Sequence, residues 1–154
     1  MTFLDQLDVT YPIIQAPMAG VSTPALAAAV SDAGGLGSIG VGATDAAGAR
    51  VMIDTIRALT YRAFNVNVFV HATPTPDAAR EAAWLHAMRP LFNAYNAEPP
   101  TELRTIYRSF ADDDAMFGML FETAPPVVSF HFGLPDAARI KALKDAGCAL
   151  IATA

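Results

Sequence analysis

The chain has 154 residues, of which 53% are hydrophobic and 16% are charged, a composition typical of one folded domain and unlike that of a disordered chain. Its 10 basic and 15 acidic residues give a net charge of −5. They form no basic stripe, so binding to nucleic acid or to an anionic membrane is not predicted.

The first part of the chain alternates a strand pattern with a helix pattern. The apolar run at residues 11–16 predicts a buried strand. Thr23 and Pro24 predict a helix start, with Thr23 as N-cap and Pro24 in the first turn, where its missing N–H costs nothing. The glycine pair at 34–35 predicts the end of this helix, and residues 36–41 predict the second strand.

The middle of the chain predicts one further strand between helices. Thr44 is expected to cap a second helix, and residues 64–70 predict a strand rich in Val and Phe. Helices follow at 77–96 and, in one or two pieces, at 101–121, where we interpret three successive aspartates as a solvated loop or helix cap. A helical insertion is therefore expected at about 76–123, between the third and fourth strands. The apolar face expected in the second helix consists of Val51, Met52, Ile56 and Leu59.

The last part of the chain continues this order. Residues 127–130 predict a strand, residues 135–146 a helix that Gly147 ends, and residues 148–152 a fifth strand. Alternating strands and helices are the pattern of a parallel sheet covered by helices. A complete barrel of this kind takes eight such units in about 250 residues. About four βα units plus a fifth strand therefore predict an α/β fold, the N-terminal half of a (β/α)8 TIM barrel.

The single cysteine, Cys148, lies in an apolar run. It excludes a disulfide within the chain, and we interpret it as a small buried hydrophobic residue, with a nucleophile as the alternative. Residues 1–10 contain two aspartates but no Lys or Arg, unlike a secretory signal. No apolar stretch approaches the roughly 20 residues that span a bilayer. A cytoplasmic protein is therefore predicted.

Three glycines, Gly35, Gly37 and Gly40, match the spacing G-x-G-x-x-G. The dinucleotide fingerprint requires these glycines after a strand and at the start of a helix. Here the predicted helix precedes the glycines and the predicted strand runs through them. We therefore interpret the first of them as part of a helix cap and turn, and we expect Gly40 and Gly42 to allow a ligand or backbone to approach closely.

Residues that follow the predicted strands are the candidates for a site, because ligands of parallel α/β folds bind beyond the carboxyl ends of the strands. The loop Ala16, Pro17 and Met18 has almost no polar side chain, which suits contact with a flat apolar ring. Asn65 and Asn67 share one face of the third strand. Buried amides need partners, so they bond neighbouring groups or a polar ligand, and Asn67 lies nearer the mouth.

His131 immediately follows the fourth predicted strand, which places its imidazole near the mouth. A histidine there can titrate near neutral pH and act as a general acid or base, and the alternative is a core histidine bonded to backbone. His71 and His86 are far from it in sequence. No carboxylate lies at ligand spacing beside any of the three histidines, so no metal site is predicted.

Taken together, five blocks of the sequence resemble class I nitronate monooxygenases. This resemblance implies a TIM barrel with non-covalent FMN that oxidises alkyl nitronates, such as propionate 3-nitronate, with O2. The products are a carbonyl compound and nitrite. The blocks, which extend over nearly the whole chain, are residues 13–20 (IIQAPMAG), 23–37, 64–67, 127–135 (VVSFHFGLP) and 147–153.

The resemblance also implies roles for individual residues. His131 matches the active-site histidine, which abstracts the α-proton of a neutral nitroalkane or holds the nitro group. Ala16, Pro17 and Met18 match the loop against the isoalloxazine ring, and Asn67 matches the asparagine that contacts the flavin. The phosphate-binding loops of the family follow strands six and seven, outside this sequence, so we expect the 154-residue chain to bind FMN weakly and to be inactive by itself.

Other functions agree with the same fold. One is an FMN-dependent enoyl reductase or an NAD(P)H:quinone reductase, although the pair Ala16-Pro17 and the block at 131–135 favour nitronate oxidation. Another is a non-catalytic barrel fragment. A half barrel leaves its first and fifth strands as open edges, which invite association. We therefore expect a homo-oligomer or a second chain that supplies the other half of the barrel.

Overall fold

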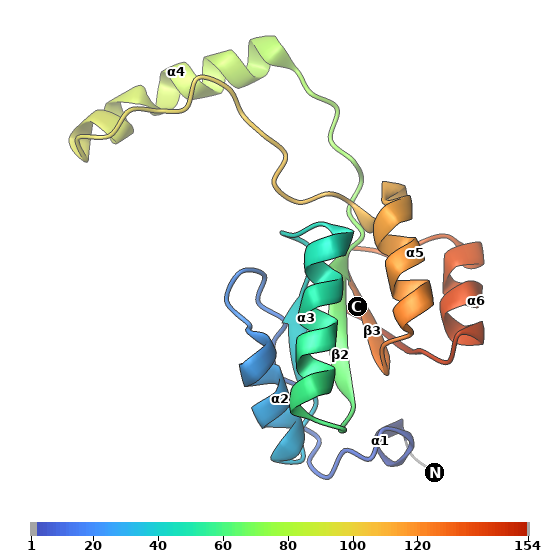
Figure 1. Ribbon diagram of the computed structural model, residues 1–154. Helices are drawn as coiled ribbons and strands as arrows, with labels where there is room; N and C mark the ends of the chain where they lie inside the picture. The colour runs from blue at the N-terminus through green and yellow to red at the C-terminus, as the bar shows by residue number, and fades with distance from the viewer. Residues whose placement is uncertain (1–2, 154) are drawn as a thin grey trace. The chain divides into compact units, whose positions relative to one another are not determined.

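A computed structural model describes residues 3–153 (Figure 1). The chain divides into two compact units, one formed by the residues up to Ala72 and from Tyr107 onward, the other by Thr73–Ile106. The first unit contains a four-stranded parallel sheet with the strand order β1-β2-β3-β4. Its strands are β1 (Gly37–Gly40), β2 (Phe64–Phe69), β3 (Val127–His131) and β4 (Ala149–Ala152).

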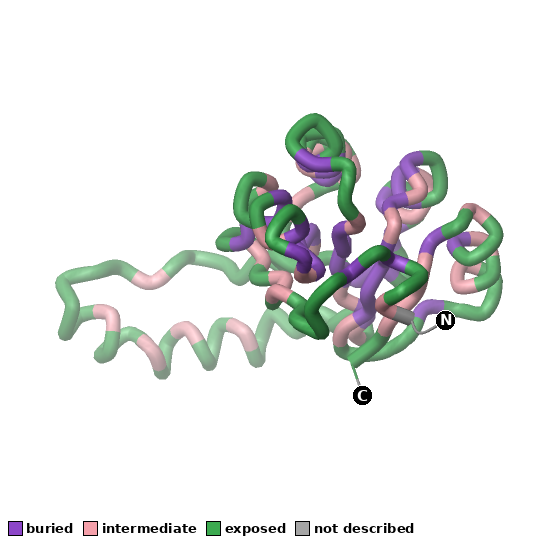
Figure 2. Tube along the Cα trace, turned by 90° about the horizontal axis from the view of Figure 1, so that it is seen from below, coloured by how far each residue is buried: buried purple, intermediate pink, exposed green. Residues whose placement is uncertain are grey.

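Four helices alternate with these strands and cover one face of the sheet (Figures 1 and 2). The apolar core lies between the helices and this face, where alternate strand residues such as Ile39, Val66 and Val128 pack against helix residues such as Ile53 and Leu120. The predicted parallel sheet covered by helices is therefore confirmed. The helices are α2 (Pro24–Asp32), α3 (Ala46–Leu59), α5 (Asp114–Thr123) and α6 (Ala137–Asp145).

The opposite face of the sheet carries a small apolar cluster at the amino ends of the strands. There Leu7 and Val9, which follow the short helix α1 (Phe3–Gln6), pack against Leu36 and Val127. Farther along β1, β2 and β3, this face also carries buried polar side chains. Because side chains alternate along a strand, one face holds the core and the other carries a polar row. The row consists of Ser38, Asn65, Asn67 and Ser129.

The prediction of a buried strand at residues 11–16 is wrong. The segment at 11–16 forms a single parallel bridge, Ile14 with Leu36, and both Ile13 and Ile14 are at least half exposed. Two hydrogen bonds make the bridge, from Gln15 N to Leu36 O (3.0 Å) and from Leu36 N to Ile13 O (2.9 Å). The segment pairs on one side only, and Pro12 lacks an N–H to donate, so the apolar pattern alone did not make a full strand.

Two helix predictions differ from the structure. The helix expected at 101–121 is wrong over residues 101–109, which are not helical; helix begins there only with η1 (Phe110–Asp112) and α5. The other difference lies at α3, whereas the start of α2 agrees. Thr23 caps α2 as predicted, by accepting from Leu26 N. The N-cap of α3 is Asp45, not Thr44, and its carboxylate accepts from Gly48 N (2.8 Å). The predicted apolar face of this helix is also displaced, because Val51 and Leu59 are exposed. The face that packs inward instead consists of Ala49, Ile53 and Ile56.

The unit Thr73–Ile106 contains one helix, α4 (Ala78–Ala94). Asp77 caps it by accepting from Arg80 N (3.0 Å), and no residue of α4 is buried. A helical insertion was predicted at about 76–123, whereas the separate unit ends at Ile106. The rest of that span, residues 107–109, η1 (Phe110–Asp112) and α5, belongs to the unit of the sheet.

Cys148 is buried, with 5% of its surface exposed. Desolvation by burial raises the pKa of its thiol, and the positive charge of Arg57 opposes this in part. A thiol that holds its proton is a poor nucleophile. The interpretation as a small buried hydrophobic residue is confirmed.

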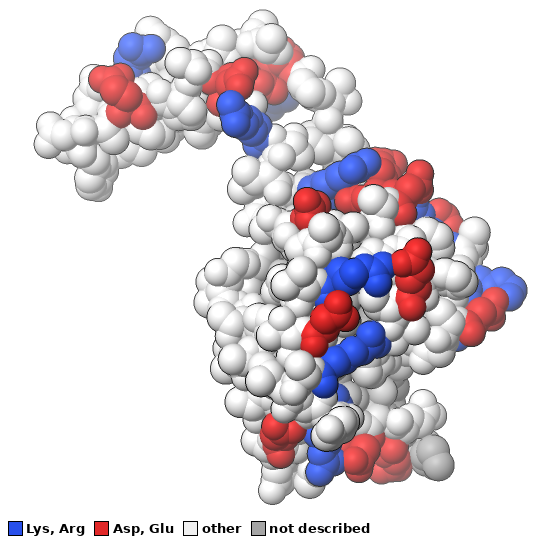
Figure 3. All heavy atoms as spheres, viewed as in Figure 1, with Lys and Arg blue, Asp and Glu red and all other residues white. Residues whose placement is uncertain are grey.

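The surface mixes charges of both signs. On the face drawn in Figure 3, acidic and basic side chains lie beside one another rather than in separate patches. Several form exposed ion pairs, such as Arg50 with Glu122 (2.5 Å) and Lys141 with Asp145 (2.5 Å). Within residues 3–153, no helix combines the length and the apolar character needed to cross a membrane.

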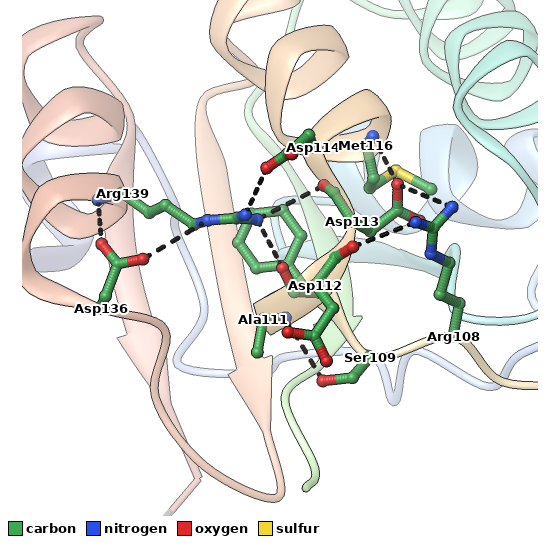
Figure 4. A network of polar contacts seen from close by, with 10 residues as sticks. Arg108, Ser109, Ala111, Asp112, Asp113, Asp114, Met116, Asp136 and Arg139 are labelled. Atoms are coloured by element: carbon green, nitrogen blue, oxygen red, sulfur yellow. Dashed lines mark hydrogen bonds and ion pairs between the residues drawn. The ribbon is translucent and has the colours of Figure 1, made fainter. Parts of the chain in front are cut away.

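Arg139 joins α6 to the segment before α5 (Figure 4). Its guanidinium donates to Phe110 O (2.6 Å) and pairs with Asp114 (2.7 Å), and it lies 5.1 Å from the ring centroid of Phe117. Only 12% of its side chain is exposed. The carboxylate of Asp136 caps α6 and lies beside the same guanidinium (3.5 Å). One planar side chain therefore contacts two carbonyls, two carboxylates and two aromatic rings.

Replacing Arg139 with Met is expected to lower the free energy of unfolding by about 2–3 kcal/mol, because a mostly buried carbonyl loses a charged donor. Arg139→Lys should recover only part of this loss, since one ammonium group cannot reproduce the planar fork. Urea denaturation followed by circular dichroism measures both. The matched control is Arg50→Met, which removes an exposed pair between helices and should cost less than about 1 kcal/mol. Equal losses in the two Met variants would contradict the prediction.

Candidate functional site

The candidate site lies at the carboxyl ends of the strands, on the polar face of the sheet. The strand register pairs Gly40 with Asn67 and Asn67 with Ser129. One step farther along the strands, Phe69 pairs with His131. Because paired residues of parallel strands project to the same face, Asn67 and His131 lie on one face at successive levels. The two residues predicted from separate strands are therefore brought together.

His131 is the last residue of β3 and is held by two hydrogen bonds, one to its backbone and one to its ring. Its carbonyl accepts from Val70 N (2.8 Å), which fixes the backbone. Its ring Nδ1 lies 2.6 Å from the hydroxyl oxygen of Thr153, and that hydroxyl donates to Phe130 O (3.1 Å). The His131 side chain is half-buried. The ring thus has a fixed position at the strand end while part of it stays accessible.

Aromatic rings surround His131. The ring of Phe132 packs edge-on against it with centroids 4.1 Å apart, and Phe69 lies 5.3 Å from Phe132 and 5.3 Å from Tyr107. Phe132 has φ +71°, a conformation that is strained for a residue with a side chain. The next residue must be glycine, because a Cβ at Gly133 would lie 2.5 Å from Val70 O. The strained turn aims an aromatic ring at His131.

The loop of Ala16, Pro17 and Met18 is rigid but presents apolar surface. Ser22 is buried beneath it, donates to Ala16 O (3.0 Å) and accepts from Met18 N (2.9 Å). A Cβ at Gly40 would lie 2.7 Å from Pro17 O, so this glycine lets the loop backbone approach the end of β1. Met18 is 43% exposed. The loop therefore offers an ordered, accessible and apolar surface at the strand ends.

The two buried asparagines each donate to a serine on a neighbouring strand. Asn67 Nδ2 donates to the hydroxyl (2.9 Å) and carbonyl (3.2 Å) oxygens of Ser129. Asn65 Nδ2 donates to the hydroxyl of Ser38 (3.2 Å), whose backbone is held in turn by the Gln15 amide (3.0 and 3.2 Å). The carbonyl oxygen Oδ1 of Asn65 is buried without a hydrogen-bond partner among the described residues. The polar row is thus ordered but leaves one acceptor to fill.

Comparison with known proteins assigns the chain to a family. A family model described as nitronate monooxygenase matches residues 2–154. The chain belongs to the nitronate monooxygenase family. The nitronate monooxygenase of Paraburkholderia phytofirmans is 56% identical over 151 residues, 98% of this chain and 41% of the relative. That of Pseudomonas aeruginosa is 49% identical over 152 residues, 99% of this chain and 43% of the relative. The chain thus spans about two fifths of the length of these relatives.

Solved structures show the same fold. The nitroalkane oxidase from Streptomyces ansochromogenes superposes with a TM-score of 0.81 at 39% identity, covering 98% of this chain and 42% of that structure. FabK from Thermotoga maritima superposes with a TM-score of 0.65 at 30% identity, covering 96% of this chain and 35% of that structure. Both likenesses support the predicted fold class, the N-terminal part of a barrel.

The G-x-G-x-x-G spacing of this chain is explained by packing. The helix α2 precedes the glycines and β1 contains two of them, as predicted. Gly34 has φ +92° in the turn after α2, and Gly40 lies against the loop. None of the three glycines of the spacing begins a helix, so they do not have the arrangement of a dinucleotide fingerprint. Within residues 3–153, no group of three or more His, Cys, Asp and Glu side chains could hold a metal ion.

Several site residues were given no role from the sequence of this chain: Phe69, Ser129, Phe132 and Thr153. Strand alternation gives a signal for two of them. Phe69 lies two residues after Asn67, and Ser129 lies two residues before His131, so each shares a face of its strand with a predicted site residue. The other two follow predicted strands, which places them near the mouth but does not predict their contacts with His131. The position of Phe132 depends on a positive φ, and that of Thr153 depends on the pairing of β3 with β4.

Proposed function

We propose that this chain is the N-terminal part of an FMN-dependent enzyme that oxidises alkyl nitronates, such as propionate 3-nitronate, with O2. The products are a carbonyl compound and nitrite. One observation carries the proposal: His131 lies half-buried at the carboxyl edge of the sheet with Nδ1 bonded to Thr153. This leaves Nε2 as the ring nitrogen available to a substrate. Membership of the nitronate monooxygenase family supports the reaction class.

The described residues fit a flavin ring. The apolar loop of Ala16, Pro17 and Met18 would lie against the flat ring, and Asn67 would contact its polar edge. The buried Oδ1 of Asn65, on the same face, is an acceptor that calls for a donor. FMN supplies the electron-accepting chemistry when bound. Barrels of this type commonly bind phosphate near strands seven and eight, so we propose that the rest of the barrel supplies that contact.

The side chains of this chain then have defined tasks. His131 Nε2 accepts the α-proton when the substrate arrives as a neutral nitroalkane, and it holds the nitro group when the substrate is already a nitronate. Phe69 and Phe132 line the same strand ends and pack against the imidazole, which covers part of its surface. Reduced contact with water strengthens a hydrogen bond between the imidazole and a charged nitronate.

Anaerobic mixing tests this proposal. The chain, completed by a polypeptide that supplies the remaining strands and loaded with FMN, is combined either with propionate 3-nitronate or with NADH, and the flavin absorbance is followed. We expect the nitronate to bleach the flavin and NADH to leave it oxidised, with nitrite released once O2 is admitted. The chain is more similar to the nitroalkane oxidase than to FabK in both sequence identity and TM-score, which agrees with oxidation of a nitronate rather than of NADH. Rapid bleaching by NADH would instead support an enoyl reductase or a quinone reductase.

We also propose that FMN binding needs a second polypeptide segment beyond these 154 residues. Among the described residues, β4 pairs only with β3, and the segment around Ile14 makes one bridge. Open edges of this kind invite another strand. After incubation with FMN and gel filtration, we expect the 154-residue chain to elute without flavin. It should retain flavin when mixed with a polypeptide that supplies the remaining strands, and a yellow monomer would overturn this proposal.

A further inference from the structure

We propose that Thr153 is a positioning residue that holds His131 in the Nδ1–H tautomer, so that Nε2 is the nitrogen that takes up a proton. The inference rests on the proposed function, in which His131 meets the substrate. It starts from two contacts of one hydroxyl group, at 2.6 Å from His131 Nδ1 and at 3.1 Å from Phe130 O.

A count of protons decides the direction of the short contact. A threonine hydroxyl has one proton to donate, and a backbone carbonyl can only accept. When the hydroxyl donates to Phe130 O, it must accept from His131, so Nδ1 carries the proton and two hydrogen bonds form. When the hydroxyl donates to Nδ1 instead, its contact with Phe130 O is no hydrogen bond. The Nδ1–H tautomer therefore makes one more hydrogen bond than the alternative.

The position of the Thr153 hydroxyl is set by the backbone. Thr153 follows the last residue of β4, and its own N–H donates to Phe130 O (3.1 Å), continuing the pairing of β3 with β4. The ring of Phe132 packs edge-on against the imidazole, with the two centroids 4.1 Å apart. A flip of the ring would place a carbon against the hydroxyl and lose the bond. The ring orientation and the tautomer are thus fixed together.

The same arrangement serves His131 before and after proton transfer. When Nε2 gains a proton, Nδ1 keeps its own proton and still donates to Thr153, so no neighbouring group has to rotate. Such preorganisation favours catalysis because no reorganisation accompanies the step. With the opposite tautomer, Nε2 would already be protonated and could not accept a proton. Thr153 therefore determines which nitrogen acts, without touching the substrate.

Long-range ¹H–¹⁵N correlation spectra of the histidine rings test this inference in the protein without flavin. The spectra are recorded at a pH where the rings are neutral, and His131→Gln identifies the His131 signals. We expect Nδ1 in the protonated range and Nε2 in the unprotonated range. In Thr153→Val, which has the same shape without a hydroxyl, a substantial share of Nε2 should become protonated. Thr153→Ser restores the hydroxyl and should return the original pattern.

Two results would overturn the inference. One is a wild-type ring protonated at Nε2, which needs no variant to observe. The other is a Thr153→Val protein, folded by circular dichroism, whose Nδ1 stays fully protonated. The spectra need neither flavin nor turnover, so they are independent of the proposed function. A wild-type Nδ1–H tautomer in a protein whose nitronate oxidation survives His131→Gln would support the inference and overturn the role of His131.

Discussion

Replacing His131 with Gln, in the FMN-loaded protein completed by the remaining strands, is expected to lower kcat/KM for a substrate whose nitroalkane group is still protonated at the α-carbon, such as 3-nitropropionate, by about 100- to 10,000-fold, the usual contribution of a general base. The loss for the nitronate anion should be smaller. The anion needs no proton abstraction, so only a hydrogen bond to a charged group is lost, worth about 1.5–3 kcal/mol. Nitrite release in air, measured with each form of the substrate, gives the two values. The difference between them separates the two tasks assigned to His131.

A second histidine provides the matched control for this experiment. His86 lies exposed on α4, which belongs to the unit Thr73–Ile106 and not to the unit that contains the candidate site. His86→Gln makes the same chemical change and should leave both rates unaltered. If His131→Gln oxidised both substrate forms at the wild-type rate, a histidine bonded only to structural partners would be the correct interpretation. Equal losses for the two forms would assign His131 to holding the nitro group alone.

The parts of the fold predicted correctly from sequence are those that depend on neighbours along the chain. The run of Val and Phe at 64–70 and its two asparagines predicted β2 and its polar face. Thr23 and Pro24 predicted the start of α2 through local capping chemistry. His131 could be placed at the mouth because it directly follows a strand. In each case the pattern and the structure depend on the same few residues.

The errors arise where a distant segment decides the outcome. Residues 11–16 have an apolar pattern, but a strand needs hydrogen-bonding neighbours, and only Leu36 pairs with this segment. The inward face of α3 contains the small Ala49, which helix–sheet packing selects and which hydrophobicity alone underrates. Thr153 reaches His131 only because β4 pairs with β3. None of these facts can be read from a local window.

The glycine spacing illustrates how one pattern can have two physical causes. In a dinucleotide site, glycines let a pyrophosphate approach a helix start. Here they let protein backbone approach protein backbone: Gly37 lies under Ala27 of α2, and Gly40 lies under Pro17 of the loop. The same absence of side chains thus serves packing around the candidate site. The stability of the fold should therefore depend strongly on having no side chain at these two positions.

Replacing Gly37 with Ala is expected to lower the free energy of unfolding by about 3 kcal/mol or more, beyond the usual cost of overpacking. An added Cβ would lie 1.8 Å from Ala27 O and 2.6 Å from Ala27 C. Both neighbours are backbone atoms in the middle of α2, so no side chain can rotate to make room. The helix would have to move off the sheet, which would also displace Thr23 and the loop before it. Urea denaturation of the variant measures the loss.

Gly118→Ala is the matched control, because it adds the same methyl group in the helix α5, where nothing lies within 4 Å. This variant should gain about 0.5–1 kcal/mol, since alanine restricts the unfolded chain and favours helix. If the free energy of unfolding falls in Gly37→Ala and rises in Gly118→Ala, then contact with Ala27, rather than loss of glycine flexibility, determines the effect at position 37. A Gly37→Ala protein with the wild-type denaturation midpoint would mean that α2 can shift at no cost, and the close packing of α2 on β1 would then not be what stabilises this end of the sheet.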